Sequence, residues 1–493
     1  MIEYGNTLFE DFDLSGYDTT EYKPYLHYFD TNSEFEDEYF GDEYYEPWVS
    51  FTSGDTLVHY NKKFNGYLRF EMLTNGTIKW KSSDTAITRT IEYSKNGGGW
   101  SEITSTTAGT GINVSAGDVV CFRGENQQYA EVIDSSAEDK YAAGNIRTVS
   151  FNGTTGNFNI AGNIMSLIKK DYDEFIHITR LSGDCNFYGM FRIGNNVKSV
   201  EDLFLPATYI TNGCYGYMFT SAGITRAMGL PAKHMKESCY RNMFADCASL
   251  TSVPALSNTD VAKHCFAAMF ARCSSLQTVP NNYLTVLNLE NADDCYGSMF
   301  KGCTALTSTP NLPAIGLSNL CYDNMFNGCT SLTSSPELPA TILCETCYHC
   351  MFEGCSSLVA APSLPAETLA YKCYARMFQN CTSLITAPEL PSINLAVECY
   401  YRMFYGCSSL TESPLLPAEL TSEGCYLEMF SGCTNLNKIT CLALTNPSGN
   451  WPFSNWVPGV ASTGTFIKHP QATWWGRGVN GIPANWTVVD YAG

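Results

Sequence analysis

A 26-residue repeat is the feature of this sequence that most restricts its fold. The unit reads C-Y-x-x-M-F-x-x-C-x-S-L-T-x-x-P-x-L-P-A-x-x-L, and its Met-Phe pair begins at residues 190, 218, 243, 269, 299, 325, 351, 377, 403 and 429. From residue 299 onward the spacing is constant, whereas the step from 269 to 299 carries four extra residues and the first two copies are degenerate. Because one such unit cannot bury an apolar face alone, the copies are expected to stack.

The unit that begins at Cys321 shows how one copy is expected to fold. Its predicted core columns contain Cys321, Met325, Phe326, Cys329 and Leu332. Cys, Met, Cys and Leu recur at i, i+4, i+8 and i+11, which predicts one face of a short helical turn. The prolines that follow remove hydrogen-bond donors and favour extended backbone. The sequence therefore predicts a solenoid of about ten coils, each made of one helical turn and extended segments.

The segments that flank the repeats have different patterns. Residues 48–165 alternate apolar and polar side chains between Asn-Gly turns, which predicts antiparallel hairpins in one small β-sandwich. Residues 166–440 hold the repeats, and residues 441–493 are expected to form a Trp-rich C-terminal cap. The predicted fold class is therefore α+β, with an N-terminal sandwich followed by a repeat solenoid and its cap.

Residues 1–47 carry most of the negative charge of the chain. They contain 14 acidic residues and a single basic one, in a chain whose formal net charge is −20. The same segment holds eight tyrosines and five phenylalanines, which predicts a docking strap whose rings enter grooves on a more basic partner. The candidate docking residues are Tyr39, Phe40, Tyr44 and Tyr45. The alternative is a loosely ordered tail.

Charge and hydropathy also exclude two classes of partner. The net negative charge has the wrong sign for coating nucleic acid. The sequence has no run of about 18 apolar residues, so insertion into a membrane is not expected.

The repeat resembles the BspA-type leucine-rich repeats of Bacteroides-group bacteria and of the phages that infect them. The likeness rests on the phrases MFxGCxSLT and PxLPA, on GNIMSLI at residues 162–168, and on two endings. These endings are GVASTGTFIKHP at residues 459–470 and GIPANWTV at residues 481–488. The likeness covers residues from about 65 to 489 and leaves the acidic segment outside. It implies a leucine-rich-repeat architecture and a surface used for adhesion or recognition.

The resemblance and the start of the sequence together predict a location. Bacterial members of the family resemble exported surface proteins, but this sequence lacks the basic and apolar regions of a secretory signal. We therefore expect synthesis in a host cytoplasm and assembly on a virion surface. The expected function is a non-enzymatic fibre or surface component, present in multiple copies. Its partners would be other virion structural proteins, through residues 1–47, and a host-surface glycan or protein. The alternatives are a bacterial cell-surface adhesin and a purely structural virion decoration.

The cysteines and histidines offer little evidence of chemistry. Eight units carry C-x7-C, whose sulfurs are too far apart within one coil for a disulfide, although bridges between coils are geometrically possible. Synthesis in a cytoplasm favours reduced thiols that pack as small apolar groups. Cys344, Cys347, His349 and Cys350 superficially resemble a metal site, but Cys347 already belongs to a core column. No catalytic, metal-binding or cofactor-binding residue is predicted, and no cofactor is expected.

Aromatic side chains supply the candidate ligand-binding surface. Tyr follows the first Cys in eight of the ten units, and Phe266 replaces it in one. This column is expected to be structural with its rings half out, the alternative being a ligand-stacking strip. The candidate ligand-binding residues are Trp474, Trp475, Arg477 and Asn480. Because adjacent strand residues face opposite sides, one of the two tryptophans should be exposed as a platform for a sugar. Capping of the last coil is the alternative role.

Overall fold

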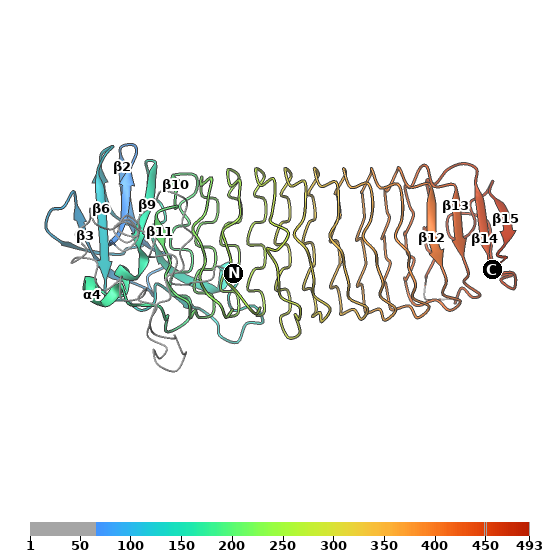
Figure 1. Ribbon diagram of the computed structural model, residues 1–493, viewed down its shortest axis with the longest axis horizontal. Helices are drawn as coiled ribbons and strands as arrows, with labels where there is room; N and C mark the ends of the chain where they lie inside the picture. Colours follow the sequence, from blue (N-terminus) through green and yellow to red (C-terminus); the bar gives the residue numbers. More distant parts are fainter. Residues whose placement is uncertain (1–65, 448, 450, 493) are drawn as a thin grey trace, which may run out of the picture.

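The computed structural model describes residues 66–447, 449 and 451–492. These residues form an elongated body, with two sheets at one end and stacked coils along its length (Figure 1). The candidate docking residues lie in residues 1–47, outside the described part of the chain, and they are Tyr39, Phe40, Tyr44 and Tyr45.

The fold is β-rich, and the described residues contain very few helices. The helical elements are η2 (Ala143–Asn145), η3 (Ile164–Leu167) and α4 (Tyr172–Phe175). The first two are 3-10 helices, and α4 is a four-residue α-helix. Helices therefore contribute little to the architecture, which is carried by strands and turns.

Two sheets at the N-terminal end contain eleven strands. The first sheet comprises β1 (Leu68–Met72), β3 (Thr90–Lys95), β4 (Ser101–Thr104), β6 (Val119–Gly124), β9 (Phe158–Asn163), β10 (Val197–Ser199) and β11 (Leu203–Phe204). The second comprises β2 (Gly76–Ser82), β5 (Thr110–Val114), β7 (Ala130–Val132) and β8 (Ile146–Ser150). The orders are β10-β9-β1-β6-β3-β4, with β11 also on β9, and β5-β2-β8-β7. Period-two patterning explains these strands: Leu68, Phe70 and Met72 are buried, whereas the residues between them are only partly buried.

Strand β9 joins the first sheet to the coils. Its pairing with β1 is antiparallel, but β10 and β11 pair with it in parallel. These two strands come from residues 197–204, so the first sheet extends past residue 165 into the start of the repeats. The apolar core is continuous across this junction, from Leu68 to Trp486.

The prediction of a helical turn in each unit is wrong. The segment from the residue before the first Cys to the second Cys, called here the turn row, forms consecutive tight turns without a helix. In the unit of Cys321, Leu320, Asn324 and Gly328 have φ of 59°, 55° and 75°. A left-handed residue at every fourth position stops a right-handed helix from continuing.

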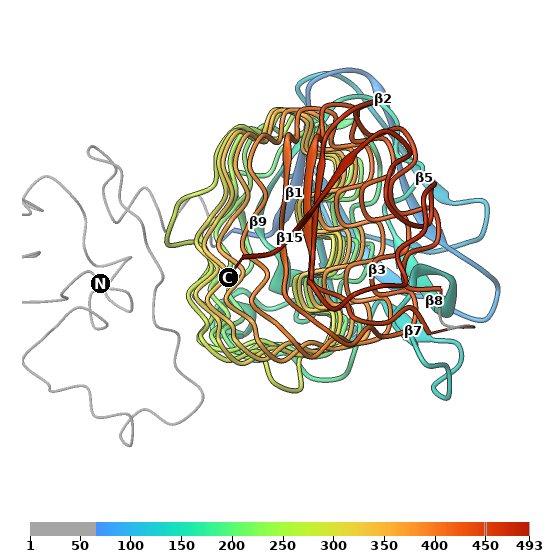
Figure 2. The same ribbon diagram turned by 90° about the vertical axis from the view of Figure 1, so that its right-hand side faces the viewer.

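The backbone N–H groups of the turn row alternate between two kinds of acceptor. Asp323 N–H donates to Leu320 O within its own coil at 2.9 Å, whereas Tyr322 N–H donates to Cys347 O of the next coil at 3.1 Å. This alternation continues along the row, so half of its amides tie each coil to its successor. Seen from the C-terminal end, successive coils superimpose (Figure 2).

Identical side chains of successive coils form buried columns. Cys321, Met325, Phe326, Cys329 and Leu332 are all fully buried. The Phe rings that follow Met stack at centroid distances of 5.5 to 5.8 Å from Phe191 to Phe430. Close packing of equivalent rings therefore holds neighbouring coils in register.

The tyrosine column is more deeply buried than the sequence suggested. From Tyr215 to Tyr426 its rings stack at centroid distances of 5.7 to 6.0 Å, and each is at most 2% exposed. The expectation of half-exposed rings is wrong because the turn row directs the Cys and the following Tyr both inward, which a helix would not do. A column without an exposed face is not a ligand-stacking strip.

The second cysteine of each unit has a specific role in the column. Cys329 Sγ donates to Phe300 O at 3.2 Å, and Cys355 Sγ donates to Phe326 O at 3.1 Å. The same contact recurs in eight coils, at sulfur–oxygen distances of 3.0 to 3.2 Å. All 22 cysteines are free thiols. A thiol fits here because it is small and apolar and still satisfies a buried carbonyl of the preceding coil.

The first and the last turn row of the stack are covered by other parts of the chain. At the N-terminal end, Tyr129 N–H donates to Asn186 O at 3.0 Å and Phe151 N–H donates to Met190 O at 3.1 Å. At the other end, Asn480 Oδ1 accepts from Asn455 N–H at 2.7 Å. The first end therefore presents carbonyls to the sheets, and the last end presents amides to the C-terminal segment.

The C-terminal segment begins with one more coil. Trp451, Asn455 and Gly459 repeat the positive φ values of the turn row, at 42°, 47° and 76°. Phe453 and Trp456 extend the Tyr and Phe columns. The third sheet is parallel throughout and consists of β12 (Glu412–Leu416), β13 (Lys438–Cys441), β14 (Thr465–Lys468) and β15 (Thr487–Asp490).

Replacing Tyr400 by Phe is expected to stabilise the protein. The Tyr400 hydroxyl is buried and has no hydrogen-bond partner among the described residues, and Phe266 already occupies the same column. An unpaired buried hydroxyl costs about 1–3 kcal/mol, so Tyr400→Phe should raise the free energy of unfolding by about 1 kcal/mol in urea titrations. The matched control is Tyr129→Phe, because the Tyr129 hydroxyl donates to Leu167 O at 2.6 Å. This control should be destabilised; any loss of stability in Tyr400→Phe would contradict the account of an unpaired Tyr400 hydroxyl.

Candidate functional site

The two tryptophans proposed as a sugar platform pack against each other. Trp474 and Trp475 stack with a centroid distance of 3.8 Å, and both are half-buried. Trp474 Nε1 donates to Ala443 O at 3.2 Å, and both rings contact Phe453 of the last coil. The expectation that one of the pair is exposed is wrong, because this segment is not a strand and alternation does not apply.

Arg477 and Asn480 hold the end of the chain together. Arg477 NH1 donates to Pro483 O at 2.9 Å and to Trp486 O at 2.7 Å. Asn480 Oδ1 accepts the amide of Asn455. The structure thus brings the four candidate residues to the end of the stack, where their contacts favour the capping role over ligand binding.

A polar network that sequence analysis missed crosses four coils on the turn-row face. Its members are Lys301, Asp323, Asn324, His349, Cys350, Glu353, Arg376 and Gln379. His349 Nδ1 lies 2.7 Å from Asp323 Oδ1, and His349 Nε2 lies 3.3 Å from Cys350 Sγ. Glu353 Oε1 accepts from Arg376 NH2 at 2.8 Å. The sequence contains a signal for this network, because its members occupy equivalent positions of successive units. These are the two variable positions between Tyr and Met, and the position after Phe.

Asp323, His349 and Cys350 are connected in the order of an orienting carboxylate, a base and a thiol nucleophile. Cys350 is only 3% exposed, however, and burial together with a hydrogen bond to Glu353 raises the pKa of its thiol. The thiol is therefore protonated at neutral pH and is not an activated nucleophile. The network ties neighbouring coils together through side chains, in addition to the backbone.

The neighbouring cysteines do not complete a metal site. Cys347 is fully buried in its column, and Cys344 Sγ donates to Leu317 O at 3.3 Å. Within the described residues, no group of three or more His, Cys, Asp or Glu side chains could hold a metal ion.

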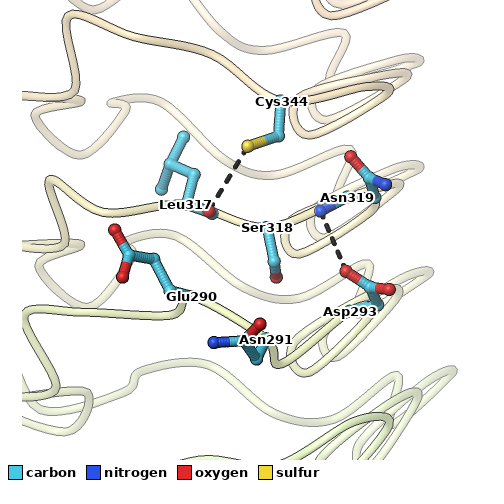
Figure 3. A pocket seen from close by; sticks show the side chains of 7 residues that line it. All are labelled: Glu290, Asn291, Asp293, Leu317, Ser318, Asn319 and Cys344. Carbon is cyan, nitrogen blue, oxygen red and sulfur yellow. Dashed lines mark hydrogen bonds between the residues drawn. The ribbon is translucent and has the colours of Figure 1, made fainter.

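A pocket of about 360 Å³ lies beside the unit that carries the four extra residues. It is lined by Glu290, Asn291, Asp293, Leu317, Ser318, Asn319 and Cys344 (Figure 3). Leu289 N–H donates to Gly316 O, and Asp294 N–H donates to Asn319 O. Five residue steps of one coil therefore face three of the next, so two of the four extra residues lie on this side of the pocket.

The pocket is acidic. Asp293 Oδ1 accepts from Asn319 N–H at 3.2 Å, and Glu290 Oε2 lies 3.4 Å from the Asn288 amide nitrogen. Neither carboxylate pairs with a lysine, arginine or histidine of the described residues, whereas the adjacent Asp294 binds His264. Burial raises the pKa of the Cys344 thiol, and the Asp293 and Glu290 carboxylates raise it further.

Comparison with protein-family models and with curated proteins finds no match for this chain. None of the helices in the described residues has the length and hydropathy needed to cross a bilayer.

Proposed function

We propose that this protein is a non-enzymatic surface component of a phage virion that infects Bacteroides-group hosts. In this proposal the coils are a BspA-type leucine-rich-repeat solenoid, preceded by a β-sandwich that acts as a spacer. The solenoid is displayed outward for recognition of a host-surface glycan or protein. The resemblance of the repeat to that family supplies the class of function.

The observation that carries the proposal is the unbroken core of the long body. One aromatic column runs from Tyr129 through the coils to Phe453, and the other runs from Phe151 to Trp456. A continuous core of this kind resists bending between units, because each coil is packed on both neighbours. Such a body suits a spacer that holds a binding surface away from a particle.

The constant frame carries different side chains at equivalent surface positions. The position after Cys-Tyr is Asp323, His349 and Tyr401 in three of the units. Arg402 lies over the Tyr401 and Tyr405 rings, at 5.2 and 5.1 Å from their centroids. Variation on a rigid frame is how repeat proteins build recognition surfaces. Useful affinity would come from several copies on one particle.

In the same proposal residues 1–47 anchor the chain to other virion structural proteins. The support is their content of acidic and aromatic residues, which is more concentrated than in the rest of the sequence. A purely structural decoration is the second candidate, and the packing of Trp474 and Trp475 as a cap favours it.

Purified particles of a phage that encodes this chain are expected to contain it in multiple copies. Mass-spectrometric inventory of the virions checks this, and particles that lack the chain should adsorb to host cells at least about tenfold more slowly. Deleting residues 1–47 should abolish incorporation. The matched control is deletion of one whole unit, residues 347–372, which should leave incorporation intact. Absence of the chain from virions would overturn the proposal, and unchanged adsorption would favour the decoration function.

A further inference from the structure

We propose that one face of the stack is the docking surface for a basic amphipathic helix of a partner protein. In each coil this face, called here the acidic face, begins two residues before the position of the last Leu of the unit. It ends at the first residue of the following turn row. In six successive coils it comprises residues 287–294, 315–320, 341–346, 367–372, 393–398 and 419–424. The inference goes beyond the proposed function, because it names the chemistry of a partner and does not depend on where the chain is located.

A row of exposed aliphatic side chains, called here the aliphatic row, runs along the acidic face. Its members are 61% to 70% exposed and are Leu287, Ile315, Ile342, Ile393 and Leu420. The backbone holds successive coils in register here: Ile315 N–H donates to Leu287 O at 3.1 Å, and Ile342 forms a parallel bridge with Thr368. Among the other described residues, only Trp451 has a large apolar side chain exposed to this extent. Such a concentration of exposed apolar side chains is typical of a protein-interaction surface.

The charge of the face favours a basic partner. Its six segments contain eight acidic residues and one basic residue, Lys372, which binds Glu398. From the first to the second Cys, the same six coils contain three acidic and three basic residues, so the excess of negative charge is local to the acidic face. The carboxylates on it that lack a lysine, arginine or histidine partner among the described residues are Glu290, Asp293, Glu345, Glu367 and Glu423. Carboxylates beside exposed aliphatic side chains complement a partner that carries lysine or arginine together with apolar side chains.

The same charge disfavours two other occupants of the aliphatic row. A second copy of the chain would bring another formal charge of −20 and another acidic face. Residues 1–47 contain 14 acidic residues and one basic one, so they would also meet the face with like charge. Like charges that face each other across an interface cost free energy. The occupant is therefore expected to be a separate, basic chain.

The spacing of the aliphatic row suits an α-helix that lies along the stack. Coils joined by parallel bridges are about 4.8 Å apart, and one turn of an α-helix rises about 5.4 Å. Alternate residues of an extended chain, which share one side, are about 6.7 Å apart and lose register with the coils sooner. From Leu287 to Leu420 the row spans about 24 Å, the length of a helix of about 16 residues. One aliphatic side chain per helical turn would then contact one coil, while flanking lysines or arginines reach the carboxylates.

The first experiment tests the chemistry of the partner. Fluorescence anisotropy measures binding of full-length protein to a labelled peptide of about 18 residues, made of Leu and Lys with every Leu on one helix face. This Leu-Lys peptide should bind at least about tenfold more tightly than a scrambled peptide of the same composition, or than one with Glu in place of Lys. Equal binding of the scrambled peptide would show attraction by charge alone. Equal binding of the Glu peptide would show no preference for a basic partner, and either result would overturn the proposal.

The second experiment tests the aliphatic row. The triple variant Ile315→Thr, Ile342→Thr, Ile393→Thr should weaken binding of the Leu-Lys peptide at least about tenfold. The matched control is Val359→Thr with Ile385→Thr, two exposed residues of neighbouring coils on another face, joined by a hydrogen bond from Ile385 N–H to Val359 O. This control should bind the peptide as the unchanged protein does. Thermal unfolding should show that both variants retain the fold, since all five side chains are exposed. Unchanged affinity in the triple variant would overturn the proposal.

The third experiment tests the carboxylates. The triple variant Glu345→Gln, Glu367→Gln, Glu423→Gln should also weaken binding of the Leu-Lys peptide at least about tenfold. Its matched control is Glu337→Gln with Glu389→Gln, which removes negative charge at exposed residues outside the acidic face and should have little effect. An equal loss of affinity in the control would mean that the net charge of the chain, and not this face, attracts the peptide, and would overturn the proposal.

Self-association tests the alternative that a second copy covers the row. Light scattering after size-exclusion chromatography should give the mass of one chain. A dimer that is lost in the triple variant Ile315→Thr, Ile342→Thr, Ile393→Thr would place a second copy on the row and overturn the proposal. None of these measurements depends on whether virions contain the chain, so the docking surface and the proposed function can fail separately.

Discussion

Above about pH 10 the stack of coils is expected to unfold in one steep transition. The cause is the burial of its thiols, which raises the pKa of Cys321, Cys355 and Cys373 to about 12. The same value of about 12 applies to Cys185, Cys239, Cys247, Cys303, Cys425, Cys433 and Cys441. In an unfolded chain these thiols would titrate near pH 8.5.

The direction of the effect follows from the two pKa values. Because the folded-state pKa is the higher one, the stability that the buried thiols contribute is fully present below about pH 8.5 and is lost as the pH rises toward 12. Each thiol lowers the free energy of unfolding by about 1.4 kcal/mol per pH unit in this range. Ten thiols acting together would remove a typical stability of about 5–15 kcal/mol within one to two pH units. The buried tyrosines act in the same direction, because burial raises the pKa of Tyr322 and Tyr400 well above 10.

A pH titration in the presence of a reductant tests this expectation. Far-ultraviolet circular dichroism reports the fold, and absorbance at 295 nm reports tyrosine ionisation. Eleven of the 30 tyrosines are buried within the described residues. Their part of the absorbance change should coincide with the change in circular dichroism and reverse on return to pH 8, because a buried tyrosine ionises only when the coils open. Ionisation of all 30 tyrosines before any loss of structure would contradict the buried columns.

Truncating Phe326 or Met325 to Ala is expected to destabilise the middle of the stack strongly. Phe326 is fully buried between Phe300 and Phe352, at centroid distances of 5.8 and 5.7 Å. Removing a buried Phe costs about 3–5 kcal/mol and a buried Met about 2–5 kcal/mol. Because stability in a repeat protein depends on the neighbours, coils on both sides should also lose protection from hydrogen exchange. Urea titration and exchange mass spectrometry measure the two effects.

Ile342 provides the matched control for these truncations. It lies in the same part of the stack but is 65% exposed, so Ile342→Ala should change the free energy of unfolding by no more than about 0.5 kcal/mol. If Phe326→Ala lowers protection only within its own coil, the coils do not stabilise each other and the continuous-core account is wrong.

The spacing of apolar residues was sufficient to predict which side chains share a buried face, but not the local backbone. Residues four apart lie on one face both in a helix and in the turn row, so Cys321 and Met325 do not distinguish the two. The difference lies in the positive φ of Leu320 and Asn324. Leucine rarely adopts this conformation, and hydrogen bonds to the next coil enforce it, which no local pattern reveals.

Predicting the surface features requires comparing equivalent positions in different coils. Asp323 and His349 both follow Cys-Tyr and are 26 residues apart, so an alignment of the units would have paired them. The sequence shows the four extra residues before Met299, but it does not show on which side of the coil they protrude. The fate of Trp474 and Trp475 could not be predicted from strand alternation, because the segment that carries them is held by contacts with Ala443 and Phe453 instead of a strand partner.

Between turn rows, the backbone hydrogen bonds all run in one direction, from the amides of one coil to the carbonyls of the next. The length of this protein can therefore change by whole units. Every coil offers carbonyls to the coil before it and amides to the coil after it, as in the bond from Tyr322 N–H to Cys347 O. The first coil therefore always needs donors such as Tyr129 N–H, and the last always needs an acceptor such as Asn480 Oδ1. Adding or deleting an entire 26-residue unit leaves both terminal requirements unchanged. Duplication within the gene can thus lengthen or shorten the reach of the molecule without redesign of either end.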